Sequence, residues 1–89
     1  MAKVLYLVTK NIDLSQDPLF PLQPEPDHQS EAVLLEEGVR VDVESLLDSM
    51  PVSAVKDDLQ SRGVTFTGNA IGYEDLLERI FSADKVITL

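Results

Sequence analysis

The stretch VSAVKDDLQSRGVTFTGNAIGYEDLLERIFSADKVITL, residues 52–89, decides the fold of this chain. It begins with a short apolar run typical of a strand, Val52–Val55, and ends with another, Lys85–Leu89. Between them, Lys56–Arg62 has acidic residues near its start and a cation before a glycine at its end, which suits a helix dipole and a left-handed cap. Tyr73–Ser82 has the apolar spacing of an amphipathic helix. The stretch therefore predicts strand, helix, helix, strand.

The helix predicted over 73–82 is the best defined of these elements. Asp75 and Arg79 form an opposite-charge pair four residues apart, which favours a helix. Its apolar stripe follows the spacing i, i+3, i+4, i+7, i+8 and consists of Tyr73, Leu76, Leu77, Ile80 and Phe81.

Two more apolar runs, Lys3–Thr9 and Ala32–Leu35, predict further strands. Such nearly continuous runs are typical of strands buried on both faces in a parallel sheet. Thr65–Thr67 is the candidate for a fifth strand. We expect residues 1–89 to form one small Rossmann-like α/β domain with three layers (α/β/α) around a mainly parallel sheet of four to five strands.

Two readings compete for the segment after the second strand. In the favoured one, Asp42 caps a helix over Asp42–Ser49, which Pro51 ends. In the other, the alternation of Val39, Val41 and Val43 continues as a strand.

Residues 11–30 form a proline-rich segment, with Pro18, Pro21, Pro24 and Pro26, that excludes a long crossover helix and predicts a loop. Inside it lies an apolar cluster, Leu19, Phe20 and Leu22. The cluster either folds back over the sheet face that a helix would cover or docks into a partner subunit.

The chain is strongly acidic, with sixteen Asp and Glu against seven Lys and Arg, for a formal charge of −9. This balance argues against direct binding of nucleic acid or of an anionic membrane surface. No apolar run has the length of a membrane span, and no signal-peptide pattern precedes the first strand, so we expect a cytoplasmic protein. A chain of 89 residues without disulfides has a thin core, which predicts oligomerisation.

The sequence offers no convincing catalytic residues, and we expect neither an enzyme nor a cofactor. It contains no cysteine and only one histidine, His28, which falls in the predicted loop. The spacing of Asp27, His28 and Glu31 is a weak candidate for a metal site. Neighbouring acids such as Asp57 and Asp58 point in different directions and are better explained as helix N-terminal charges. An enzyme that uses these two carboxylates is the least favoured hypothesis.

The order of these segments resembles the DsrH/TusB family of DsrE-like sulfur-relay proteins. The resemblance rests on four pieces: KVLYLVTK (3–10), EAVLLEEGVRV (31–41), VSAVKDDLQSRGV (52–64) and IGYEDLLERIFSADKVITL (71–89). It implies a Rossmann-like fold, assembly with itself or with DsrE/DsrF-like (TusD/TusC-like) subunits, and a place in cytoplasmic sulfur transfer. That transfer serves tRNA wobble-uridine thiolation in some organisms and sulfur oxidation in others.

The relay chemistry of the family does not carry over to this chain. Some DsrH-like members have a cysteine after the first strand, whereas residues 11–30 have none, and a persulfide requires a thiolate. We therefore expect a non-catalytic structural or regulatory subunit, or alternatively a stand-alone homo-oligomeric binding module of the same fold. The candidate interface residues are Leu19, Phe20, Leu22, Gly38, Val39, Arg40, Asp57 and Asp58.

Overall fold

The apolar runs of the sequence form one parallel sheet of five strands in a computed structural model of the chain, which describes residues 2–12, 28–41, 50–66 and 68–89. The strand order is β4-β3-β2-β1-β5, and all four neighbouring pairs are parallel. The elements in chain order are β1 (Ala2–Val8), β2 (His28–Leu34), the 3-10 helix η2 (Glu36–Arg40), β3 (Val52–Val55), α1 (Lys56–Arg62), β4 (Asn69–Ile71), α2 (Tyr73–Ser82) and β5 (Lys85–Thr88).

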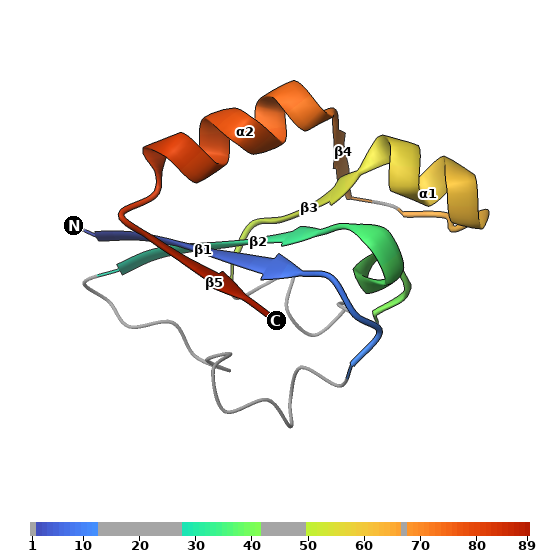
Figure 1. Cartoon of the computed structure of the whole chain (residues 1–89), viewed down its shortest axis with the longest axis horizontal. Coiled ribbons are helices and arrows are strands. Elements are labelled where there is room, and N and C mark those ends of the chain that lie inside the picture. Colours follow the sequence, from blue (N-terminus) through green and yellow to red (C-terminus); the bar gives the residue numbers. More distant parts are fainter. Residues whose placement is uncertain (1, 13–27, 42–49, 67) are drawn as a thin grey trace.

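Helix α2 covers one face of the sheet (Figure 1), whereas Leu59 of α1, beyond the carboxyl end of β3, packs in the core of the opposite face. Because side chains alternate along a strand, each of the central strands contributes to two cores. Under α2, Leu76 packs in a cluster with Leu5 of β1 and Val33 of β2. On the opposite face the core includes Tyr6, Val8, Ala32, Leu34, Ala54 and Leu89. Burial on both faces explains why the first two strands read as continuous apolar runs.

The structure confirms the α/β fold class and the two helices of the C-terminal stretch. Helix α1 spans Lys56–Arg62, and Gly63 caps it in the left-handed conformation with φ 62°. Helix α2 begins at Tyr73, directly after Gly72, and ends at Ser82. The dipole and capping signals located these ends because they act within one helical turn and do not depend on tertiary contacts.

Three details of the sequence analysis were wrong. The second strand begins at His28, so residues 28–30 belong to β2 and not to the proline-rich loop. The fifth strand is Asn69–Ile71, because it is this segment that pairs with β3, while residues 65 and 66 lie outside any strand. Arg79 forms its ion pair with Glu31 of β2 and not with Asp75, since β2 lies within reach of its side chain.

Of the segment after β2, the structure describes residues 35–41. Val39 lies in the 3-10 helix η2, so the alternating-strand reading fails from its first residue. The alternative helix over 42–49 falls outside the described residues, as does the apolar cluster of Leu19, Phe20 and Leu22. On the sheet face opposite α2, the described residues that pack on the core include Leu59 of α1 and Val39 of η2.

Candidate functional site

The loops after β2, β3 and β4 meet at one edge of the sheet. In a parallel sheet all strands end at the same edge, which is where open α/β folds place their sites. Three elements begin there: η2 follows β2, α1 follows β3, and α2 follows β4. Figure 1 shows η2 and α1 close together at this edge. The edge thus gathers side chains that lie far apart in the sequence.

Asp58 is the centre of this edge. Asp58 is only 8% exposed, and its carboxylate has three partners. Oδ2 accepts the backbone N–H of Glu36 at 2.9 Å. Oδ1 accepts the hydroxyl of Tyr73 at 3.3 Å and lies 3.5 Å from Nη1 of Arg62. One carboxylate therefore ties together the segments after three strands, and these bonds compensate for its burial.

Two arginines and one glutamate extend this cluster toward solvent. Nε of Arg62 lies 2.8 Å from Oε1 of Glu37, and Nε of Arg40 lies 3.1 Å from Oε2 of the same carboxylate. Nη2 of Arg40 also donates to the backbone oxygen of Arg62 at 3.3 Å. The hydrogen bond from Arg62 lowers the pKa of Glu37 and, in return, raises that of Arg62. The cluster holds two cations and two carboxylates, which neutralise one another, so it acts as a clamp between η2 and α1.

The backbone conformation of Glu36 supports the conclusion that the cluster acts as a clamp between η2 and α1. Glu36 has φ 54°, a left-handed conformation that is uncommon for a residue with a side chain. Its N–H donates to Asp58, and two residues later Gly38 packs directly against the carbonyl oxygen of Val8. Strained backbone of this kind persists only where the surrounding contacts hold it. The clamp of Asp58 and the contact at Gly38 provide that support.

We expect the Tyr73 hydroxyl to titrate above the ordinary tyrosine range. Partial desolvation raises its pKa, and the nearby negative charge of Asp58, which also accepts its hydrogen bond, raises it further. Between the ordinary value of about 10 and the raised value, the folded protein keeps a proton that the unfolded chain has lost. Stability therefore falls as the pH rises through this window. Ultraviolet titration of tyrosinate measures the shift.

The chain provides the controls for that titration. Tyr6 is buried, so the signal of Tyr73 is obtained as the difference between the wild type and Tyr73→Phe. Asp58→Asn removes the negative charge while keeping the size of the side chain, and should return the Tyr73 pKa toward its ordinary value. An unchanged Tyr73 titration in Asp58→Asn would show that the hydroxyl does not sense this carboxylate.

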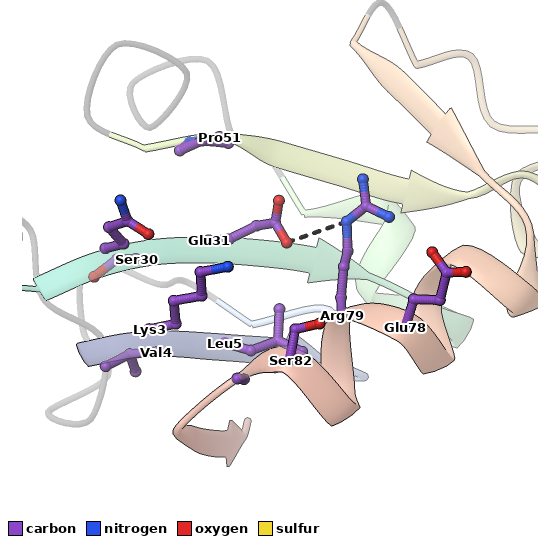
Figure 2. Close-up of a pocket in the computed structure, with 11 residues that line it drawn as sticks. Lys3, Val4, Leu5, Ser30, Glu31, Pro51, Glu78, Arg79 and Ser82 are labelled. Carbon is purple, nitrogen blue, oxygen red and sulfur yellow. Dashed lines mark ion pairs between the residues drawn. The ribbon is translucent and has the colours of Figure 1, made fainter. Parts of the chain in front are cut away.

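A second feature is a hollow of about 660 Å³ at the opposite end of the sheet (Figure 2). Its polar lining comes from the starts of β1 and β2 and from the last turn of α2, and it comprises Lys3, Gln29, Ser30, Glu31, Glu78, Arg79 and Ser82. Figure 2 shows Glu31 and Arg79 pointing toward one another, with Nε of Arg79 3.1 Å from Oε1 of Glu31. The buried Nε–H makes no hydrogen bond, so this contact is an ion pair only. The Nη1 of Arg79 donates to the backbone oxygen of Asp75.

The structure separates the residues that the sequence selected at the carboxyl edge. Gly38 is buried and Val39 is only 3% exposed within the core, which leaves Arg40 as the exposed member of that trio. Asp57 is exposed, whereas Asp58 is buried. Their role in an interface stays a prediction, as does that of Leu19, Phe20 and Leu22, which lie outside the described residues.

Sequence reasoning missed the joining of Asp58 to Tyr73 and of Glu37 to both arginines. The available signal was the position of each residue just after a strand of a parallel sheet. Within the described ranges, no group of three or more His, Asp or Glu could hold a metal ion. In the same part of the chain, no helix is both long and apolar enough to cross a membrane.

A single parallel sheet with helix α2 on one face and a clamp of charged residues at its carboxyl edge defines a small Rossmann-like α/β protein. Among solved structures, the chain is similar to the crystal structure of the YchN protein from E. coli, with a TM-score of 0.74 and 19% sequence identity over 100% of both chains. At this identity the likeness establishes the fold alone. No protein-family model and no curated protein sequence matches the chain.

Proposed function

We propose that this protein is a non-catalytic subunit of a DsrE-type sulfur-relay complex in the cytoplasm, where it binds and positions a partner that carries the sulfur. The observation that carries the proposal is the combination of a fold similar to that of YchN with a sequence that resembles DsrE-like relay proteins but has no cysteine. The more specific assignment, to the DsrH/TusB type of subunit, rests on the sequence resemblance described above.

The chemistry of sulfur transfer supports a passive role. A relay protein holds sulfane sulfur as a persulfide, which forms on a cysteine thiolate. Serine and methionine, the alternatives in this chain, provide no such thiolate. The carboxylate at the carboxyl edge, Asp58, is engaged by Glu36, Arg62 and Tyr73, so it is bound into the clamp and not exposed to a substrate. The protein would therefore act through its shape and its contacts.

The hollow in Figure 2 favours a second candidate function, that of a stand-alone homo-oligomeric module that binds a small molecule. Its lining includes cations and carboxylates from β1, β2 and α2, which suit a polar ligand. Light scattering on the purified chain separates the candidates. A stable self-assembled oligomer supports the binding module, whereas a weakly folded or aggregating chain that a cysteine-bearing subunit rescues supports the relay complex.

The relay proposal is tested by affinity purification of the tagged chain from its own cells, with mass spectrometry of the proteins that accompany it. We expect a cysteine-bearing DsrE-like subunit among them. The recovered complex is then loaded with labelled sulfane sulfur, and we expect the label on the cysteine of the partner and none on this chain. Recovery of this chain alone, or labelling of this chain itself, would overturn the proposal.

A further inference from the structure

Helix α2 exposes three large apolar side chains along one line. Tyr73 is 48% exposed, Leu77 is 52% exposed and Phe81 is 84% exposed. Their spacing of four residues places them above one another on one side of the helix. Of the five apolar residues that the sequence assigned to one stripe, only Leu76 is fully buried. The apolar face of α2 is therefore wider than the part of it that is buried against the sheet.

The exposed line continues onto the edge of the sheet. Val86 of β5 is 39% exposed and pairs in register with Leu5 of β1. Leu5 packs beneath α2 with Leu76, so Val86 points to the same face of the sheet as α2. We call the surface made by Tyr73, Leu77, Phe81 and Val86 the α2 stripe. Contiguous exposed apolar surfaces with a polar rim are typical of protein-binding sites.

The charges beside the α2 stripe are negative. Glu74 and Glu78 are both exposed, and they precede Leu77 and Phe81 by three residues, which makes them neighbours of the stripe on the helix surface; Glu78 also lines the hollow. The single cation of α2, Arg79, is paired with Glu31 inside the hollow on the other flank. Lys85 adjoins Val86 but pairs with Val4, which belongs to the core of the opposite face, so it points away from the stripe.

We propose that the α2 stripe docks an amphipathic helix of a partner protein that has apolar residues on one face and Lys or Arg along their border. The apolar face would cover Leu77 and Phe81, and the basic border would meet Glu74 and Glu78. A second copy of this chain fits less well, because a two-fold interface would bring together two stripes that both have acidic borders, on chains that each have a net charge of −9. The inference rests on the proposed function only in that the chain has a partner.

The docking surface is connected to the clamp at the carboxyl edge. Tyr73 contributes its ring to the α2 stripe, while its hydroxyl donates to Asp58. A helix bound to the stripe would shield this ring from water. Because the Tyr73 hydroxyl is bonded to Asp58, and Asp58 contacts Arg62, binding would also change the surroundings of these two residues. Binding should therefore shift the amide signals of residues 58–62 as well as those of α2 itself.

The test uses the whole chain and a synthetic helical peptide of Leu and Lys, with a Leu and Glu peptide of the same pattern as its control. Titrations followed by nuclear magnetic resonance map the binding surface. We expect the Leu and Lys peptide to shift the amides of α2 and β5, with an affinity that falls as salt is added, and the acidic peptide to leave them unchanged. Leu77→Ser together with Phe81→Ser should weaken binding by more than about tenfold.

Matched variants separate this site from general attraction to an acidic protein. Glu74→Lys should weaken binding more than Asp57→Lys, because both acids are exposed and are the second residue of their helices, but Glu74 is a surface neighbour of Leu77 on α2 whereas Asp57 lies on α1. Gln60→Ser, on the exposed side of α1, is the control for the truncation of exposed side chains to serine at positions 77 and 81, and it should leave binding unchanged. Equal effects of the two lysine variants, or undiminished binding by the double serine variant, would overturn the proposal. So would a dimer that the double serine variant converts to a monomer, since the occupant would then be a second copy.

Failure of this test differs from failure of the relay proposal. Peptide binding at the α2 stripe involves no sulfur, and it requires no particular partner. A bound peptide together with the absence of a cysteine-bearing partner in cells would retain the docking surface and reject the relay. A cysteine-bearing partner that binds the double serine variant as well as the wild type would retain the relay and reject this surface.

Discussion

Gly38→Ala is expected to lower the free energy of unfolding by about 3 kcal/mol, the upper end of the range for overpacking. A Cβ atom at this position would lie 1.8 Å from the carbonyl oxygen of Val8. That oxygen belongs to the backbone at the end of β1 and accepts the N–H of Leu35 at 3.0 Å, so it cannot move without breaking the bond that joins β1 to the segment after β2. Either the sheet edge or η2 must shift.

Urea unfolding followed by circular dichroism measures this change. The control is Gly72→Ala, because a Cβ there would meet only the Cε atom of Lys56 at 3.8 Å, an ordinary contact, and the backbone φ of −87° suits any residue. We expect Gly72→Ala to lie within about 0.5 kcal/mol of the wild type. Equal stabilities of the two variants would mean that η2 does not press on β1 as described.

Asp58→Ala is expected to cost about 2 kcal/mol, which is the scale of a lost hydrogen bond to a charged group. The substitution leaves the N–H of Glu36 without its acceptor, and it also removes the partner of the Tyr73 hydroxyl and of Arg62 Nη1. Because Arg62 is part of an exposed ion pair with Glu37, its share of the loss should be small. Most of the effect should come from the strained backbone at Glu36 losing its support.

Asp57→Ala is the matched control for Asp58→Ala. It removes the same charge from the same first turn of α1, but from an exposed residue, so only the helix-dipole contribution of about 0.3–1 kcal/mol is lost. Urea unfolding of both variants gives the comparison. If Asp57→Ala cost as much as Asp58→Ala, the helix dipole would account for both, and the clamp would contribute nothing of its own.

The sequence predicted the parts of the fold that depend on neighbours along the chain. Acidic first turns, a glycine after Arg62 and the 3.6-residue period located α1 and α2, because these signals act within a few residues. The sequence did not predict the short strand β4, because Asn69–Ile71 has weak strand character and owes its conformation to pairing with β3. The same reason explains His28–Ser30, which become strand only beside β1.

In the candidate site, too, the positions of some residues were predictable from the sequence, whereas their contacts with one another were not. Arg40 was selected from the sequence because residues after strands of a parallel sheet lie at its carboxyl edge, and Asp58 because it lies in the first turn of a predicted helix. Their pairing was not predictable, because Glu37 and Arg62 are separated by 25 positions and meet only when η2 and α1 pack together. The acidic pair 57–58 looked uniform in sequence, and burial alone distinguishes its two members.

By itself the sequence determined that this protein holds no thiol, carries a large negative charge and alternates strands with helices in its C-terminal half. These properties are fixed by residue types and by short-range periodicity. The tertiary structure decided which apolar residues of α2 are buried, since Leu76 faces the sheet whereas Phe81 lies on an exposed side of the helix. It also decided which charges are neutralised, because ion pairs such as Arg79–Glu31 require two strands or helices to lie side by side.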